Sequence, residues 1–178
     1  MRKSYSPLRY PGGKAKLYPL IKNLIETNDL SGQTYIEPFA GGSGLALKLL
    51  FNNDVKRIII NDYDPAIYSL WYIILNHCDE LCELIDKTPI TVDEWNKQKE
   101  IYIQGNNTDI ISYGFSTLFL NRTNISGIIT GGIIGGIEQQ GKYSIDARFN
   151  KISLKKRIQK IFAKKDQIIL TNQNAADF

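Results

Sequence analysis

The chain has 178 residues, of which 43% are hydrophobic and 22% are charged. This length and balance are those of an ordinary soluble globular protein with one domain, or one domain with an insertion. No apolar run approaches the roughly 20 residues that a membrane-spanning helix needs, and the basic N-terminus lacks the apolar segment of a signal peptide. With two cysteines and one histidine, the sequence predicts a cytoplasmic protein without a metal site.

The net charge is +4, and much of the positive charge is concentrated in one region. Residues 142–165 contain nine Lys or Arg residues against a single Asp. A cluster of this kind favours a polyanionic partner, although a solvated basic helix face would give the same pattern.

The first part of the chain alternates strand and helix patterns. An amphipathic helix is expected over 14–26, with Pro19 in its first turn. Residues 34–77 then read as strand, glycine-rich turn, helix, strand and helix. The segments that carry this pattern are TYIEPF, GGSG, GLALKLLF, RIIIND and PAIYSLWYIILNH. They predict the opening of a doubly wound α/β sheet.

The pattern then changes. Two helices are expected over 91–103 and 109–122, the first with Thr91 as its N-cap. Residues 124–145 are punctuated by glycines and indicate a hairpin or irregular loop. A basic helix over 151–165 and a third core strand at 167–172 complete the pattern.

We therefore predict an α/β fold with a partial Rossmann-like core of about three strands and a helical plus β-hairpin insertion. The expected parts are core residues 1–90, an insertion at 91–150, and a return to the core at 151–178. The first strand would form an unpaired edge, long and apolar, because doubly wound sheets usually have more strands. This edge predicts self-association.

The glycine turn at 41–44 raises the question of its ligand. A phosphate-binding P-loop requires a GK[ST] ending, which is absent. The dinucleotide fingerprint G-x-G-x-x-G is only half matched, because its third position is Leu47. A tight turn without a ligand remains the structural alternative.

Two acidic residues narrow the choice. Asp62 ends the second predicted strand, where a carboxylate can accept hydrogen bonds from ribose hydroxyls. Glu37 precedes the glycine turn, where it would repel a pyrophosphate but attract a cation. S-adenosylmethionine meets both conditions, with its ribose for Asp62 and its cationic groups for Glu37. The alternatives are a helix cap for Asp62 and a solvated acid for Glu37.

Five segments occur in order along the chain: RYPGGK (9–14), EPFAGGSG (37–44), IINDYDP (59–65), FLNRTNISGI (119–128) and ADF (176–178). Together they resemble the Dam-type, adenine-N6-specific DNA methyltransferases, over essentially the whole chain. The resemblance implies a class I methyltransferase fold, S-adenosylmethionine as cofactor and double-stranded DNA as partner. The cofactor-binding residues that it implies are Tyr10, Lys14, Glu37, Phe39, Gly41, Gly42, Gly44, Asp62, Asp177 and Phe178. Asp177 would bind the adenine amino group and Phe178 would stack on its ring.

The resemblance also makes the insertion the target-recognition part. The DNA-binding residues that it implies are Arg9, Asn121, Arg122, Asn124 and Ser126. Their side chains suit phosphate oxygens or base edges. The structural alternatives are that Asn and Ser cap a helix end, and that Arg122 binds a carboxylate. The basic helix over 151–165 would add sequence-independent affinity for DNA.

The catalytic D-P-P-Y tetrapeptide of the family is absent, because no two of the six prolines are adjacent. No catalytic residue is therefore assigned, and the isolated chain is expected to be inactive. It would be a piece of a complete methyltransferase, one half of a split enzyme with a complementary chain, or a non-catalytic remnant that binds DNA or cofactor. From another class, the alternative is a dinucleotide-binding oxidoreductase domain.

Overall fold

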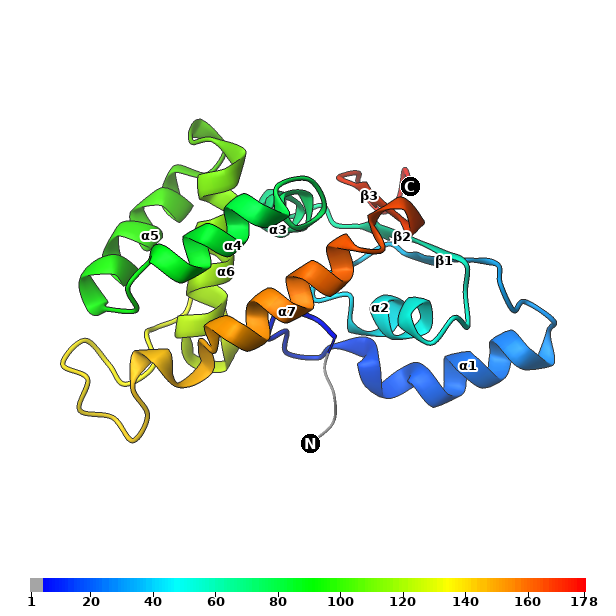
Figure 1. Ribbon diagram of the computed structural model, residues 1–178, viewed down its shortest axis with the longest axis horizontal. Coiled ribbons are helices and arrows are strands. Elements are labelled where there is room, and N and C mark those ends of the chain that lie inside the picture. Colours follow the sequence, from blue (N-terminus) through cyan, green and yellow to red (C-terminus); the bar gives the residue numbers. More distant parts are fainter. Residues whose placement is uncertain (1–4) are drawn as a thin grey trace.

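The computed structural model describes residues 5–178, so the first four residues of the basic leader lie outside the described part (Figure 1). At its centre is a parallel sheet of three strands in the order β1-β2-β3. The strands are β1 (Thr34–Glu37), β2 (Arg57–Asn61) and β3 (Ile168–Thr171). The three strands predicted from the sequence are confirmed. Strand β3 pairs with β2, although β2 ends at Asn61 and β3 begins only at Ile168.

The described part of the chain has seven α-helices. They are α1 (Tyr18–Thr27), α2 (Gly44–Phe51), α3 (Pro65–Asn76), α4 (Cys78–Lys87), α5 (Val92–Gln104), α6 (Ile110–Thr123) and α7 (Lys151–Phe162). Of these, α5 and α6 lie at the end of the molecule opposite the sheet (Figure 1). Short 3-10 turns occur at Lys14–Leu17, Gly105–Asn107, Ile125–Gly127, Ile145–Arg148 and Lys165–Gln167. Within residues 5–178, no helix is long and apolar enough to cross a membrane.

Local sequence signals begin α3, α5, α6 and α7 at or next to the expected residues, whereas α1 begins four residues later than residue 14 and α4 was not predicted. The Thr91 side chain caps α5 by accepting from the Glu94 N–H at 3.2 Å, and Pro65 follows the Asp64 cap of α3. Asp109 and Asn150 cap α6 and α7 in the same way. These caps satisfy N–H groups that have no partner within the helix.

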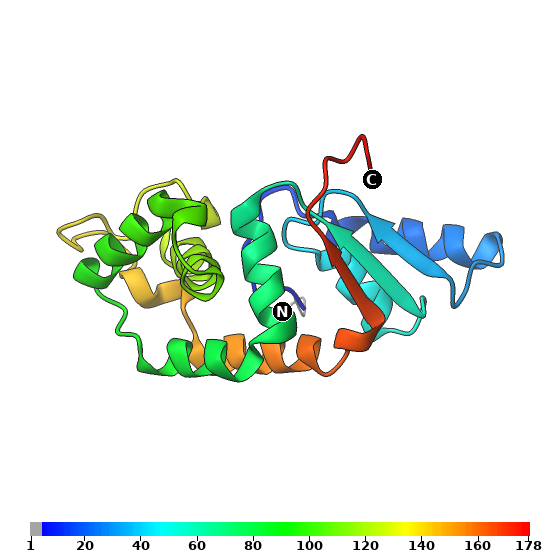
Figure 2. The same ribbon diagram turned by 90° about the horizontal axis from the view of Figure 1, so that it is seen from above.

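One hydrophobic core connects the sheet to the insertion. Trp71 of α3 and Phe119 of α6 are both fully buried, and α6 packs along α3 and α5. Helix α7 contacts both α3 and α4, and it runs from the insertion back to the sheet (Figures 1 and 2). The insertion is therefore packed onto the core by the same helix that leads into β3.

The predicted β-hairpin in the insertion is wrong. Residues 124–150 contain one isolated bridge, Asn124 to Ile133, and otherwise turns. The Gln139 side chain donates to the Ile134 and Gly136 carbonyls and accepts from the Ile145 N–H. These backbone groups are therefore not available for hydrogen bonds between two strands of a hairpin. Gly135 and Gly136 both have positive φ, which reverses the backbone direction.

The sheet leaves one face open in the described part of the chain. Ile36, Ile59 and Ile169 lie side by side in register across the three strands. Ile36 is 50% exposed and Ile169 is 41% exposed, whereas Ile58 and Ile60 on the opposite face are fully buried. Figure 1 shows α2 and α7 on the same side of the sheet. The free edge of β1 is four residues long, so the predicted edge exists but is short.

We expect this open face to cause self-association. Replacing Ile36 and Ile169 with Lys should lower the concentration dependence of the apparent mass, because the charges prevent apolar faces from pairing. Light scattering over a concentration series measures this. Leu20→Lys on α1, where Leu20 is 57% exposed, is the matched control and should change little. A wild-type chain that stays monomeric at high concentration would contradict the expectation.

Candidate functional site

The glycine turn between β1 and α2 is held by groups at the carboxyl end of β2. The Ala40 N–H donates to the Asn61 carbonyl at 2.7 Å, and the Gly41 N–H donates to Asp62 Oδ2 at 2.7 Å. On the other side, the Trp71 indole donates to the Gly41 carbonyl at 2.9 Å. Gly41 has φ +46°, which an L side chain rarely adopts. The turn is therefore fixed from two elements, the carboxyl end of β2 and α3.

The leader lies directly against this turn. A Cβ on Gly41 would come within 2.8 Å of the Tyr10 ring, and one on Gly42 would come within 3.0 Å of Tyr10 Cβ. The Asn121 side chain holds the leader from α6: its Oδ1 accepts from the Arg9 N–H at 2.8 Å and its Nδ2 donates to the Arg9 carbonyl at 2.9 Å. Glycines in the turn thus permit a close approach of the two segments.

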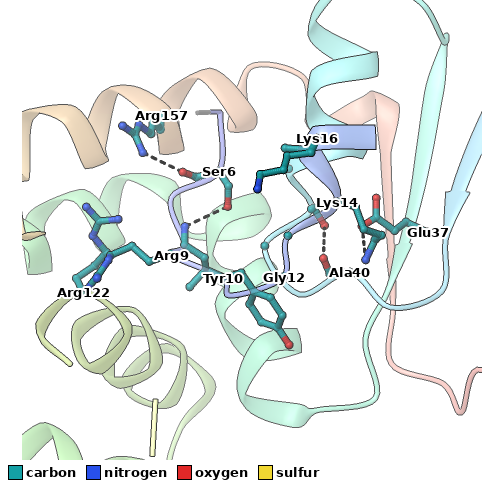
Figure 3. Close-up of a pocket in the computed structure, with 16 residues that line it drawn as sticks. Ser6, Arg9, Tyr10, Gly12, Lys14, Lys16, Glu37, Ala40, Arg122 and Arg157 are labelled. Carbon is teal, nitrogen blue, oxygen red and sulfur yellow. Dashed lines mark hydrogen bonds and ion pairs between the residues drawn. The ribbon is translucent and has the colours of Figure 1, made fainter. Parts of the chain in front are cut away.

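A cavity of about 690 Å³ lies between the leader and the glycine turn. Figure 3 shows Lys14 and Glu37 at one end of it and Arg9, Arg122 and Arg157 at the other. Its volume is in the range of small-molecule sites, which are concave and bear a few polar groups. The cavity is therefore the candidate ligand site.

Glu37 is buried at the end of β1, with 2% of its surface exposed. Its Oε1 pairs with Lys14 Nζ at 2.9 Å, and the same Nζ donates to the Phe39 carbonyl at 2.6 Å. The second oxygen, Oε2, is buried and has no hydrogen-bond partner among residues 5–178. Burial raises the pKa of Glu37, and Lys14 and, more weakly, the nearby Ala46 N–H oppose this rise. A buried carboxylate oxygen without a partner is costly, and it suits a cationic donor.

Asp62 follows β2 and faces the glycine turn. Besides the Gly41 N–H, it accepts the Asp64 N–H at 3.1 Å through Oδ1. Burial raises the pKa of Asp62 while these two N–H groups lower it. Each carboxylate oxygen of Asp62 can accept a further hydrogen bond, so Asp62 can still bind a hydroxyl or amine donor of a ligand.

The structure brings part of the implied cofactor-binding set to the cavity wall. The lining residues from that set are Tyr10, Lys14, Glu37, Gly42 and Gly44. Gly41 and Asp62 are not among the lining residues: Gly41 lies in the glycine turn, and Asp62 follows β2 and accepts from the Gly41 N–H. Phe39 is 68% exposed, and its contribution is the carbonyl that accepts from Lys14.

Asp177 and Phe178 lie apart from the cavity wall. The segment after β3 leaves the carboxyl end of the sheet, and both residues are exposed on it (Figure 2). Asn172 fastens the start of this segment by donating to the Asp62 carbonyl at 2.7 Å. The last residues therefore begin beside Asp62, although their side chains do not line the cavity.

Asn61 is a buried residue of this site that sequence reasoning left without a role. Its Nδ2 donates to the Pro38 and Gln173 carbonyls, and its Oδ1 accepts from the Thr171 hydroxyl and the Gln173 N–H. It thereby joins the carboxyl ends of all three strands. A polar residue that ends an apolar strand, in RIIIND, was the available signal.

The two asparagines implied as DNA-binding residues are buried. Asn121 is 1% exposed and Asn124 is fully buried. Asn121 Nδ2 also donates to the Gly127 carbonyl at 2.8 Å, and Asn124 Oδ1 accepts from the Trp95 indole at 2.6 Å. The Asn124 amide further donates to three carbonyls, those of Ile128, Ile129 and Gly131. Both amides are engaged internally, so this geometry does not favour direct DNA contact by either asparagine.

Of the other implied DNA-binding residues, Ser126 is exposed, and Arg9 and Arg122 are partly buried. Ser126 lines a second cavity of about 260 Å³ together with Arg9 and Arg148. Arg122 binds backbone oxygens: Nε donates to the Arg148 carbonyl at 2.7 Å. No arginine in residues 5–178 is paired with a carboxylate, so the alternative of a carboxylate partner for Arg122 is not realised there.

Several lysines of the basic segment are engaged in packing. Lys151 donates to the Asp86 and Thr88 carbonyls, and Lys155 pairs with the Asp86 carboxylate. Lys160 lies over the Tyr5 and Phe51 rings, at 4.7 Å and 4.4 Å from the centroids. Part of the positive charge of α7 thus serves the contacts that join α7 to α4 and to the leader.

The parallel three-stranded sheet, with a cavity beside its carboxyl ends, is compatible with the core of a methyltransferase. The model of the D12 class N6 adenine-specific DNA methyltransferases matches residues 10–177, and the chain belongs to this family. The chain is also similar to the type II methyltransferase M.MjaIII of Methanocaldococcus jannaschii, with 27% identity over 134 residues. That match covers 68% of this chain and 46% of the relative, so the chain spans about half the length of the relative. The resemblance inferred from the sequence is confirmed.

We expect Asn124→Ala to lower the free energy of unfolding by about 3 kcal/mol. The change leaves the buried hydrogen-bond partners of Asn124 unpaired, and each unpaired polar group costs about 1–3 kcal/mol. Chemical denaturation measures the free energy of unfolding. Asn106→Ala, at an exposed position, is the matched control and should change it by less than about 0.5 kcal/mol. An Asn124→Ala variant that is as stable as the wild type but binds DNA more weakly would mean that Asn124 contacts DNA and is not structural.

The raised pKa of Glu37 predicts a pH dependence of stability. Between the ordinary pKa of 4.5 and the higher folded value, the folded state binds more protons than the unfolded state. The free energy of unfolding contributed by Glu37 is therefore lost as the pH rises through that interval. Denaturation at a series of pH values should show a smaller loss in Glu37→Gln than in the wild type. Equal slopes would mean that Glu37 titrates normally in the folded chain.

Proposed function

We propose that this chain is the cofactor-binding and DNA-contacting part of an enzyme that methylates adenine N6 in DNA, with S-adenosylmethionine as the methyl donor. The observation that carries the proposal is Glu37 Oε2, a buried acceptor without a partner in the described residues, at the cavity beside the glycine turn. Family membership supports the reaction class. The core is proposed to be Rossmann-like and of class I, since its strands are parallel and its site lies at their carboxyl ends.

The residues present fit this cofactor. Glu37 would accept hydrogen bonds from the ammonium group at the methionine end of the cofactor. Lys14 would pair with the carboxylate at the same end of the cofactor. Asp62 would accept hydrogen bonds from the ribose hydroxyls, because its carboxylate has lone pairs that the Gly41 and Asp64 N–H groups do not use. When bound, S-adenosylmethionine would supply an electrophilic methyl group on its sulfonium. The chain's own residues would hold the cofactor and orient it toward the DNA side of the cavity.

Two implied cofactor residues, Asp177 and Phe178, remain proposals that need a rearrangement of the last segment. Their side chains would have to turn from solvent toward the Asp62 side of the glycine turn. An aspartate acceptor and an aromatic ring are suitable partners for the adenine amino group and the adenine face. Asn172, bonded beside Asp62, brings the segment within range.

The same argument weighs against a dinucleotide. A pyrophosphate placed over the glycine turn would lie close to the carboxylate of Glu37, which repels it. Gly41 already uses its N–H for Asp62, so the turn offers fewer free donors for phosphate oxygens. The oxidoreductase alternative is therefore not favoured.

Calorimetric titration with S-adenosylmethionine tests the proposal. We expect saturable binding by the wild type, with at least a tenfold loss of affinity in Glu37→Gln, since a hydrogen bond to a charged group contributes about 1.5–3 kcal/mol. Asp62→Asn should also weaken binding. Asp79→Asn, an exposed acid on α4, is the control and should bind like the wild type.

Two outcomes would contradict the cofactor assignment. One is a folded wild-type chain that binds NAD and not S-adenosylmethionine. The other is unchanged affinity in Glu37→Gln. In the second case the ammonium would have to bind elsewhere, and the unpartnered oxygen would have no role.

A further inference from the structure

Three guanidinium groups from distant parts of the sequence gather at the end of the cavity opposite Glu37. Arg9 comes from the leader, Arg122 from the end of α6 and Arg157 from α7. Figure 3 shows the three side chains around one end of the cavity. Like charges repel, so bringing three guanidinium groups together costs free energy, which a bound anion would offset.

Internal contacts hold these arginines without neutralising them. Arg122 donates to the Arg148 and Pro7 carbonyls, and Arg9 Nη1 donates to the Asn124 carbonyl at 3.0 Å. Arg157 Nη1 donates to the Ser6 carbonyl at 3.0 Å. Backbone carbonyls orient a guanidinium but carry no net charge. The arrangement is therefore rigid and positively charged.

Arg122 is the most enclosed member of the cluster. Burial, with the charges of Arg157, Arg9 and Arg148, lowers its pKa to about 10. It stays charged at neutral pH, and its desolvation has not been offset by an acid within residues 5–178. Guanidinium groups fixed in this way suit the planar, bidentate binding of a phosphate.

We propose that Arg9, Arg122 and Arg157 together bind one phosphodiester group of DNA, next to the methyl-donor cavity. The inference rests on the proposed function and deepens it, because it names one phosphate as the group that the cavity recognises. A phosphate held there would fix the backbone of the substrate strand at the mouth of the cavity. The target nucleotide could then reach the end that holds Glu37. Arg9 would contact a phosphate and not a base edge.

Salt dependence of DNA binding tests whether the arginines share one phosphate. Each phosphate contact contributes about −0.9 to the slope of log affinity against log salt. Arg9→Gln and Arg157→Gln should each make the slope less steep by no more than about 0.9, because Arg122 and the remaining arginine still face the shared phosphate. The double variant should also lose no more than about 0.9 in total. Fluorescence anisotropy with a short labelled duplex measures the slopes. A double variant that loses about 1.8 would show two separate phosphates and overturn the proposal.

Matched variants keep the test specific. Arg57→Gln removes an exposed arginine from the amino end of β2, away from the cavity, and should leave the slope unchanged. Arg157→Lys keeps the charge and should retain the slope. Arg122 is left intact because its side chain holds two backbone carbonyls, and its loss could unfold the chain.

Parallel measurements separate this proposal from the proposed function. S-adenosylmethionine binding should be unchanged in Arg157→Gln. Duplex binding that does not respond to the cluster overturns the phosphate site while the cofactor assignment stands. A wild-type chain that is stabilised by inorganic phosphate, yet binds no duplex, overturns the assignment to DNA in favour of a free phosphate.

Discussion

The pair of hydrogen bonds between the Asn121 side chain and the Arg9 backbone is the constraint on which the site depends. They join positions 112 residues apart, at 2.8 Å and 2.9 Å, and they seat the leader on the end of α6. Gly127 permits this contact, since a Cβ there would meet the Arg9 carbonyl at 2.3 Å. With the leader in place, Tyr10 covers the glycine turn and the cavity gains its second wall.

The cavity has two chemically opposite ends (Figure 3). Toward the sheet, a buried carboxylate shares one oxygen with Lys14 and keeps the other for a donor. Toward the insertion, guanidinium groups are oriented by backbone carbonyls alone. A cationic cofactor and an anionic nucleic acid are therefore drawn to different ends of one space, which suits transfer of a group between them.

The open face of the sheet has a related significance. Ile36, Ile59 and Ile169 form an apolar row that nothing in residues 5–178 covers, whereas Ile58 and Ile60 are fully buried on the other face. A sheet of parallel strands is normally covered on both faces. The row therefore marks a face on which another chain or segment would pack.

The sequence by itself determined the three strands, the helix starts and the acidic residues of the turn. These depend on local signals such as apolar runs, caps and the glycines of EPFAGGSG, which act within a few residues. Only the tertiary structure decided that Asn121 and Asn124 are internal, that Asn61 joins the strands, and that Arg157 lies beside Arg9. An amide or a guanidinium has the same sequence pattern whether it faces solvent or a buried carbonyl. The role of such a group is fixed by its partners, which lie 110 or more residues away for Asn121, Asn61 and Arg157. For Asn124 the deciding partner is Trp95, 29 residues away.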